Sequence, residues 1–328
     1  MFKKGKKTAI VAFVFLVFII LATFITGCGK TEQNNDKINI VTTVFPEYDW
    51  VKNIIGENTD SIELSLLINN GVDLHSYQPS ADDIVKIISC DMFIYVGGES
   101  DKWVKDVVSK STNKDIIVID LIDVLGNKAK QEEIKEGMQT EEDCDDEEGP
   151  EYDEHIWLSL KNASTLCSYI CEKICLIDEK NKDTYITNSE SYIKKIEELD
   201  KQYEQAVESS SLRTLLFADR FPFRYLVNDY GLDYYAAFLG CSAESEVNPS
   251  TFAFLANKID ELNLKVILKC ENSDESIAKT VKETTKTKNQ KILTMDSMQS
   301  ITEKDVKNGI TYLSVMAKNL DTLKEALK

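Results

Sequence analysis

The chain has 328 residues, of which 43% are hydrophobic and 9% aromatic, and its formal net charge is −18. That length favours two domains over one, and the hydrophobic content excludes a disordered chain. An acidic surface repels nucleic acid phosphates, so we expect no nucleic acid partner. The same charge is compatible with gathering cations, although a need for solubility alone would also explain it.

The N-terminus has the features of an export signal over residues 1–27. Four lysines precede an apolar run from residue 9 to residue 25, which only Thr23 interrupts. A basic start and an apolar core are typical of secretory signals, although the length of the run would also allow an uncleaved membrane span. Cys28 follows Thr-Gly, which resembles a bacterial lipobox and implies that Cys28 is lipidated. Residues 28–37 are then expected to form a flexible tether.

Strands alternate with helices from residue 38 to about residue 121. Runs rich in β-branched residues predict strands, and periodic runs bounded by Gly or Pro predict helices. This alternation indicates βαβ units and a mainly parallel sheet. The expected strands are 38–44, 62–68, 92–96 and 116–121, and the expected helices are 46–56, 81–89 and 103–109.

An acidic segment at residues 131–154 interrupts the alternation. Its densest part, residues 141–148, contains seven acids and one cysteine. Like charges repel one another, so this segment is predicted to be a mobile loop. Two interpretations stay open, because the loop would either collect cations weakly or only be solvated.

A long helix is expected to follow. Residues 180–210 contain no Gly or Pro, and apolar side chains recur at intervals of three and four residues from Ile193 to Val207. A helix of that length would extend about 45 Å. The β/α alternation then resumes, with strands expected at 215–218, 234–238, 266–269 and 292–294 and helices at 223–230, 251–261, 276–284 and 310–327.

We therefore predict an α/β fold of two (β/α) lobes with mainly parallel sheets, joined by one long backbone helix. The expected boundaries are 38–178 for the N-terminal lobe, 179–211 for the linking helix and 212–328 for the C-terminal lobe. Ligands of open α/β sheets bind beyond the carboxyl ends of the strands. The expected binding site is therefore the cleft between the lobes.

The cysteines give a weaker signal. Besides Cys28 the chain has seven, and an odd number cannot all pair within one chain. Cys167, Cys171 and Cys175 recur every four residues, which places them on one helix face. Such thiols could bind a soft metal, but buried cysteines more often pack as small apolar residues. We favour the core interpretation.

The chain has only two histidines. His75 lies in a turn after the second expected strand, and His155 lies where the acidic segment ends. Binding residues often occupy such loops, and neutral imidazole is a common ligand of transition metals. The two rings could therefore converge on one ion, although a single histidine is more often a surface or packed residue.

Several segments in succession resemble one known family. They are TTVFPEYDWVKNIIG, GVDLHSYQPSADDIVKI with DMFIYVGG, DEHIWLSLKNA, DRFPFRYLVNDYGLDYYAAF and GITYLSVMAKNLDTLKEAL. On these motifs the chain is identified as a member of the cluster A-I binding lipoproteins of zinc and manganese ABC importers, the ZnuA and AdcA group, over residues 37–328. The resemblance implies that His75 and His155 bind the metal. It also implies two lobes bridged by a long helix.

The second lobe departs from the family pattern. The third ligand is normally a His or Glu, and that position falls on Arg220, which cannot bind a cation. We expect the neighbouring Asp219 to be the third ligand, with a structural ion pair between Asp219 and Arg220 as the alternative. Asp296 resembles the aspartate of the family's Thr-Asp-Ser segment and is expected to be the fourth ligand. Weaker candidates are Glu244, Glu246 and Glu271.

The resemblance implies a binding protein rather than an enzyme. We expect a monomer that captures Zn²⁺ and delivers it to an ABC permease and its ATPase, held by its lipid anchor outside the cytoplasm of a Gram-positive bacterium. Two imidazoles and two carboxylates would also suit Mn²⁺, so a manganese-specific protein is the alternative. Binding should weaken below about pH 6.5, because histidine ligands must be neutral.

Two rival functions belong to other classes. A surface adhesin without a metal is one, because related proteins are exposed and abundant. A zinc hydrolase is the other, but the sequence contains no HExxH, GxSxG or GxxxxGK[ST] motif.

Overall fold

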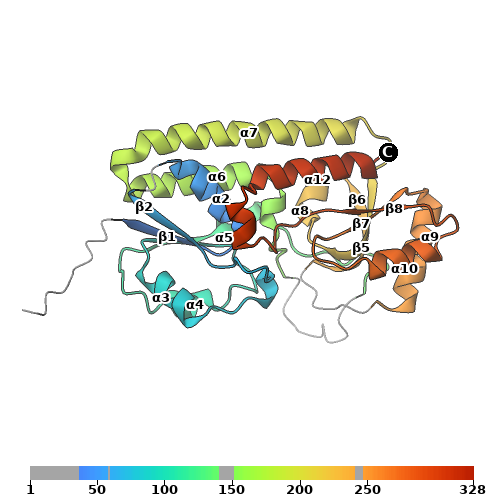
Figure 1. Cartoon of the computed structure of the whole chain (residues 1–328), viewed down its shortest axis with the longest axis horizontal. Coiled ribbons are helices and arrows are strands. Elements are labelled where there is room, and N and C mark those ends of the chain that lie inside the picture. The colour runs from blue at the N-terminus through green and yellow to red at the C-terminus, as the bar shows by residue number, and fades with distance from the viewer. Residues whose placement is uncertain (1–36, 58–59, 140–150, 241–246) are drawn as a thin grey trace, which may run out of the picture. The chain divides into compact units, whose positions relative to one another are not determined.

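Two four-stranded sheets, each entirely parallel, organise the chain (Figure 1). The structure is a computed structural model, and it describes residues 37–57, 60–139, 151–240 and 247–328. The predicted lipidation residue Cys28, the densest part of the acidic segment and the candidates Glu244 and Glu246 lie outside these ranges.

The first sheet has the strand order β2-β1-β3-β4. Ile40 of the first strand lies opposite both Leu64 and Met92. The central strand β3 is a largely buried run of apolar residues, as expected where helices cover the faces of a parallel sheet. The strands are β1 (Ile38–Thr42), β2 (Ile62–Leu66), β3 (Met92–Tyr95) and β4 (Ile117–Asp120), and the helices among them are α2 (Phe45–Ile55), α3 (Ala81–Ser89), α4 (Val104–Val108) and α5 (Leu121–Leu125).

The second sheet has the order β6-β5-β7-β8. Its central strand β5 is the longest, and its pairing with β6 shifts register between Phe217 and Arg220. The strands are β5 (Thr214–Phe221), β6 (Asp233–Leu239), β7 (Val266–Lys269) and β8 (Lys291–Thr294), and the helices among them are α8 (Arg224–Asp229), α9 (Pro249–Leu262) and α10 (Ser276–Thr284).

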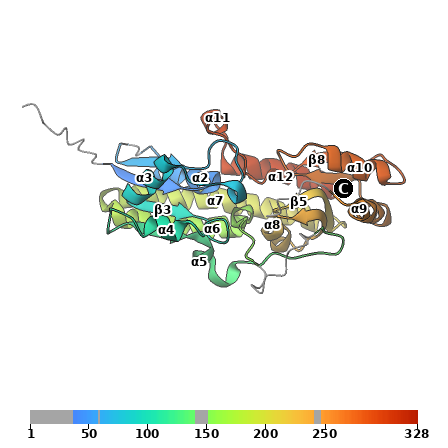
Figure 2. The same ribbon diagram turned by 90° about the horizontal axis from the view of Figure 1, so that it is seen from below.

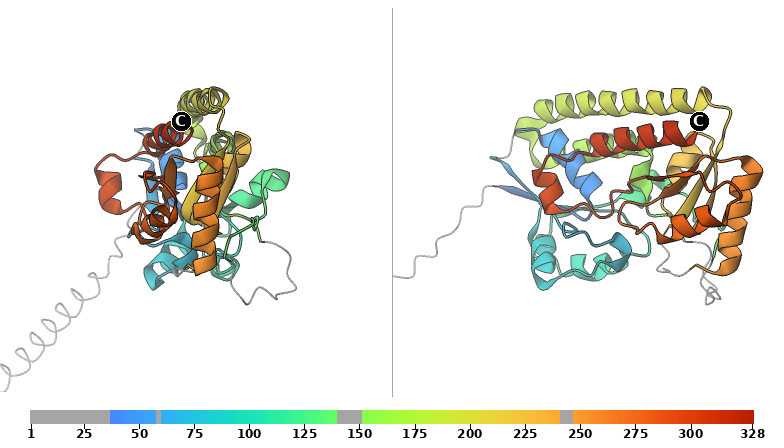
Figure 3. Two further views of the ribbon diagram at one scale, coloured as in Figure 1. Left: turned by 90° about the vertical axis from the view of Figure 1, so that its right-hand side faces the viewer. Right: turned by 45° about the vertical axis from the view of Figure 1, so that its right-hand side comes forward.

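A layer of long helices runs past both sheets. The helix α7 (Lys182–Glu208) packs against α6 (Leu160–Ile177), α2 and α12 (Tyr312–Ala326), and Figures 1 and 3 show α7 extending beside elements of both sheets. The predicted long helix is thus confirmed, although the structure divides residues 161–211 between α6 and α7. The domain boundaries themselves stay a prediction.

The closing helix α12 contacts the first lobe as well as the second. The ring of Tyr312 lies edge-on to Trp50 of α2 at 5.5 Å between centroids, and the Tyr312 backbone N–H donates to the carboxylate of Asp49 at 3.0 Å. Because these groups are buried, the C-terminal end of the chain stabilises the helix that follows the first strand.

Two short helices were missed. The helix α5 directly follows β4, with Asp120 accepting from the N–H of Asp123 at its start, so its first residue was assigned to the strand. The helix α11 (Glu303–Lys307) has a capping box at Thr302. Figure 2 shows α5 and α11 projecting on opposite sides. Five-residue helices show little periodicity, although α4, which has the same length, was expected.

The cysteine prediction is confirmed for the helix α6, because Cys167, Cys171 and Cys175 are buried in the apolar core. All three are free thiols. Among the described helices none is long and apolar enough to cross a bilayer, and the apolar run at residues 9–25 lies outside the described ranges.

Candidate metal site

His75 lies in a short 3₁₀ turn (Leu74–Ser76) that follows β2. The turn is capped by Asp73, whose Oδ1 accepts the His75 backbone N–H at 3.0 Å. The His75 ring is 13% exposed, so it borders solvent while its backbone is fixed. The cap explains why this loop residue has a defined position.

His155 precedes a second 3₁₀ turn (Ile156–Leu158) and is completely buried. One oxygen of Asp153, Oδ1, accepts the His155 backbone N–H at 2.9 Å and lies 3.0 Å from Nδ1 of its ring. The hydroxyl of Tyr225, from α8 of the second lobe, donates to the Asp153 carbonyl at 2.9 Å. Both lobes therefore hold the segment that carries His155.

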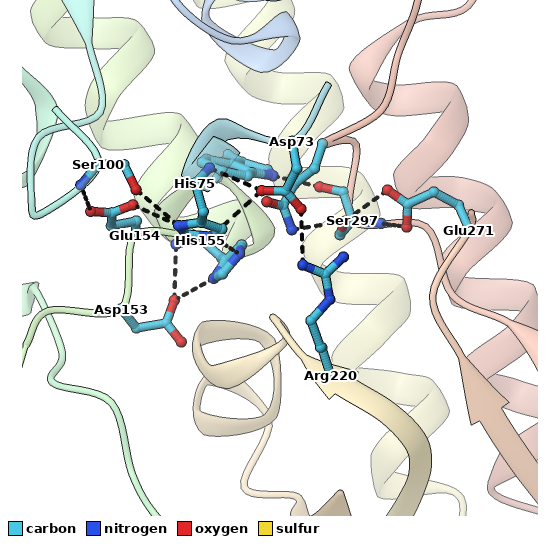
Figure 4. Close-up of polar contacts among 11 residues, drawn as sticks. Asp73, His75, Ser100, Asp153, Glu154, His155, Arg220, Glu271 and Ser297 are labelled. Atoms are coloured by element: carbon cyan, nitrogen blue, oxygen red, sulfur yellow. Dashed lines mark hydrogen bonds and ion pairs between the residues drawn. The ribbon is translucent and has the colours of Figure 1, made fainter. Parts of the chain in front are cut away.

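The two imidazole rings meet. Their Nε2 atoms are 3.3 Å apart and their centroids 5.2 Å apart (Figure 4). In a tetrahedral zinc site with Zn–N bonds of 2.0–2.1 Å, two ligand nitrogens are separated by about 3.3–3.4 Å. The expected proximity of the rings is thus confirmed, and their separation fits that of two nitrogens bound to one ion.

A carboxylate fixes each ring from the side opposite Nε2. Glu154 Oε2 lies 3.2 Å from Nδ1 of His75, and Asp153 holds Nδ1 of His155. Ser100 contacts both members of the His75–Glu154 pair. Its Oγ lies 2.9 Å from Nδ1 of His75, and its backbone N–H donates to Glu154. A proton retained on Nδ1 leaves the Nε2 lone pair for a metal, and such outer carboxylates also make the imidazole a stronger ligand.

Two glycines allow this packing. A Cβ built on Gly98, where φ is +86°, would lie 2.5 Å from the Glu154 carboxylate, and one built on Gly240 would lie 3.1 Å from the ring of His155. Left-handed φ values disfavour side chains, and the first approach is also too close for any Cβ. Position 98 must therefore be glycine for the Glu154 carboxylate to reach His75.

The charges around the rings shift two pKa values. Burial opposes ionisation of Glu154, but its hydrogen bond to His75 and the charge of that ring lower the Glu154 pKa below its usual value. Burial likewise opposes a charge on His155, but the Asp153 carboxylate raises the His155 pKa above its ordinary value of 6.5. A proton therefore competes with a metal for His155 more strongly than it would for an ordinary histidine.

Asp73 links the histidines to the second lobe. Its Oδ2 lies 3.2 Å from Nη1 of Arg220, and its Oδ1 lies 3.9 Å from Nε2 of His75. With its amide oriented so that the nitrogen faces Asp73, Gln299 donates to Oδ1 at 2.9 Å and accepts from Nε2 of His155 at 3.1 Å. Gln299 follows Met298, whose φ of +63° changes the direction of the backbone in the loop after β8.

The structure places Asp219 inside β5 rather than at its end, close to the register shift. Its two oxygens each accept a backbone N–H, one from Arg220 at 2.8 Å and one from Cys270 at 2.9 Å. The alternative ion pair between Asp219 and Arg220 does not form, because the guanidinium of Arg220 points to Asp73 instead (Figure 4).

Asp296 follows β8 and accepts the N–H of Met298 through Oδ1 at 2.8 Å. Burial and the charge of Glu271 raise the pKa of Asp296 to about 6. Glu271 itself accepts from the backbone N–H and the hydroxyl of Ser297, both at 2.8 Å. These contacts give Glu271 a supporting role in the loop that carries Asp296.

The four predicted ligands are therefore not assembled together. Within the described ranges, no group of three or more His, Cys, Asp or Glu side chains is arranged to hold a metal ion. The histidines meet, while Asp219 and Asp296 belong to a neighbouring part of the second lobe. A cleft of about 610 Å³ separates the lobes here, and its walls include Gly71, Asp73, Asp219, Arg220, Glu271 and Gln299.

Sequence reasoning missed the residues that position the histidines. Asp153 and Glu154 directly precede His155, and the run Asp-Glu-His was a usable signal because metal-binding histidines commonly pair with carboxylates. Asp73 stands two residues before His75 in the same way. No sequence pattern indicated that Gln299 contacts the site, since its position beside His155 depends on the backbone turn at Met298.

Comparisons with known proteins find matches along almost the whole chain. The family described as "Zinc-uptake complex component A periplasmic" (ZnuA) matches residues 40–326. The zinc-binding lipoprotein AdcA of Streptococcus pneumoniae (strain R6) is 30% identical over 316 residues, which are 94% of this chain and 60% of that protein. The chain thus spans about 60% of the length of such longer relatives.

A relative of similar length and a solved structure are also similar to this chain. The high-affinity zinc uptake system protein ZnuA of Bacillus subtilis (strain 168) is 27% identical over 331 residues, covering 100% of this chain and 99% of that protein. The Zn(II)-bound ZnuA-like domain of Streptococcus pneumoniae AdcA superposes with a TM-score of 0.69 at 28% identity, covering 89% of this chain and 99% of that domain.

Proposed function

We propose, on the premise that this chain belongs to the ZnuA family of zinc-uptake complex components, that it binds one Zn²⁺ ion and supplies it to an importer. The observation that carries the proposal is the pair of Nε2 atoms 3.3 Å apart. A carboxylate holds each ring by its Nδ1, and this arrangement directs both lone pairs to one point.

We infer that His75 and His155 are the first two ligands. Asp296 is proposed to supply a further oxygen from the second lobe once the cleft closes, because it follows β8 and directly precedes Ser297 of the cleft wall. Asp219 is the weaker of the two acidic candidates, since both of its oxygens would have to release backbone N–H groups.

Zinc is the proposed cargo rather than manganese. The two side chains that the structure brings together are imidazoles, and imidazole suits Zn²⁺ whereas carboxylates suit Mn²⁺ better. The names of the relatives favour the same ion, because the proteins from Streptococcus pneumoniae and Bacillus subtilis are both described by zinc. A binding protein needs no open coordination position, whereas a zinc hydrolase does.

The partners follow from the role in uptake. A family member that captures an ion outside the cytoplasm must release it to a permease, which an ATPase drives. The lipobox resemblance at Cys28 supports a lipid anchor for this chain, and the relative from Streptococcus pneumoniae is named a lipoprotein. We propose a monomer tethered to the outer face of a Gram-positive membrane.

Elemental analysis of protein purified without added metal, followed by competition between Zn²⁺ and Mn²⁺, tests the proposal. We expect one zinc per chain and displacement of manganese by zinc. The variant His155→Ala should lose the ion, while Cys171→Ser, remote from the histidines, should keep it. Protein that binds neither ion, or that binds zinc equally well without His155, would refute the function.

A further inference from the structure

The contact between Arg220 and Asp73 crosses the cleft beside the two histidines. Arg220 extends from β5 of the second lobe, and Asp73 caps the turn of His75 in the first (Figure 4). The guanidinium is one-third exposed and the carboxylate one-fifth exposed, so the pair lies at the open side of the site.

Asp73 presents a carboxylate beside the imidazoles, and its Oδ1 also accepts the His75 backbone N–H. Its Oδ1 lies 3.9 Å from Nε2 of His75, whereas donor atoms around tetrahedral zinc are about 3.2–3.5 Å apart. The pull of Arg220 on Oδ2 and of Gln299 on Oδ1 holds the carboxylate slightly away from the imidazoles. A small rotation about the side-chain bonds would bring an oxygen to ligand distance.

We propose that Arg220 is a displaceable counter-cation and that Asp73 becomes the third protein ligand when zinc displaces it. This inference rests on the proposed function and names one more ligand for the same site. A guanidinium and a divalent cation repel each other, so an ion beside Asp73 weakens the contact of Arg220 with that carboxylate. The arginine therefore lowers the affinity for zinc and holds the lobes together until the ion arrives.

Gln299 couples this exchange to the second histidine. Its amide bridges Asp73 and Nε2 of His155, so an ion at Nε2 must break both contacts at once. Arrival of zinc thus frees Asp73 from Gln299 and from Arg220 in the same step. The loop after β8, which also carries Asp296, loses this contact to the first lobe in the same event, while Glu271 still holds it through Ser297.

The test is the zinc affinity of Arg220→Gln compared with that of Arg224→Gln. Arg224 is a matched control, because it lies four residues away and pairs with Glu133 rather than with Asp73. We expect Arg220→Gln to bind zinc about tenfold more tightly, within the 5–150-fold range typical of energetic coupling, and Arg224→Gln to match the wild type. Asp73→Asn should bind more weakly, and Arg220→Gln should add little in that background.

A second readout separates this role from a merely structural one. Hydrogen exchange of residues 71–76 without metal should increase in Arg220→Gln and not in Arg224→Gln. Unchanged or weaker zinc binding by a folded Arg220→Gln would overturn the inference while leaving the histidine site intact. Failure of the wild type to bind zinc, or undiminished binding by His155→Ala, would instead remove the proposed function and this inference with it.

Discussion

Glu154 is the sequence neighbour of His155, yet its carboxylate lies 3.2 Å from Nδ1 of the other histidine, His75. One short segment therefore positions both rings, with Asp153 on His155 and Glu154 on His75. The arrangement explains how residues 80 positions apart in the sequence present their Nε2 atoms to one point.

Replacing Glu154 should weaken zinc binding without removing a ligand. Glu154→Gln retains the size of the side chain but loses the charge that holds His75, and substitutions of such outer partners typically cost about 10–100-fold in metal affinity. Titration against a competing chelator measures the loss. Glu151→Gln, an exposed neighbour, serves as the control, and equal affinities for the two variants would rule out the orienting role.

Binding of zinc should respond to pH through His155. The Asp153 carboxylate raises the pKa of His155 above 6.5, so protons begin to compete with zinc at a higher pH than an ordinary histidine would allow. The affinity should therefore fall with decreasing pH already above 6.5. In Asp153→Asn the onset should move to lower pH. Calorimetric titrations from pH 8 to pH 5 would show this, and a flat profile would contradict it.

The stability of the first lobe should depend on Asp101. Burial raises the pKa of Asp101 to about 7, and one of its oxygens has no hydrogen-bond partner. Because the pKa in the unfolded chain is near 3.8, the folded state holds this proton more tightly. That contribution to stability is complete below pH 3.8 and is lost as the pH rises through 7.

Asp101→Asn should remove this dependence. The amide can still accept the N–H of Gly97, as the carboxylate does at 3.0 Å. At pH 8 the variant should therefore be more stable than the wild type by up to about 4 kcal/mol, the equivalent of the shift, with no gain at pH 3.5. Urea unfolding at the two pH values measures it, with exposed Asp106→Asn as control; a gain of equal size at both would refute the assignment.

The buried thiols should resist alkylation in the native protein. Burial raises the pKa of Cys90 to about 12 and that of Cys171 to about 11, and thiolates rather than thiols react. Treatment with iodoacetamide at pH 8 and peptide mass spectrometry should show both unmodified until urea is added. Rapid native labelling of Cys171 would mean that α6 and α7 separate in solution.

Much of the fold could be predicted because its signals are local. The strands and helices of both lobes are long enough for their periodicity to show, and the bounds expected for α3, β7 and α10 agree with the structure. The short helices α5 and α11 were missed because about one helical turn shows little hydrophobic periodicity. The proximity of the histidines came from the family resemblance, since no local pattern joins residues 75 and 155.

The second half of the site was harder to predict because it depends on the register of one strand. The pairing of β5 shifts register near Arg220, and no sequence pattern marks such a shift. The guanidinium therefore reaches Asp73, while Asp219 turns to backbone N–H groups. The ligand roles of Asp219 and Asp296 stay predictions.

X-ray absorption at the zinc edge of the loaded protein tests the central claim most directly. We expect two imidazole nitrogens at about 2.0–2.1 Å with oxygen atoms completing the shell, and loss of one imidazole in His75→Ala. A shell containing sulfur at about 2.3 Å, or one without imidazole, would show that the two histidines do not hold the ion.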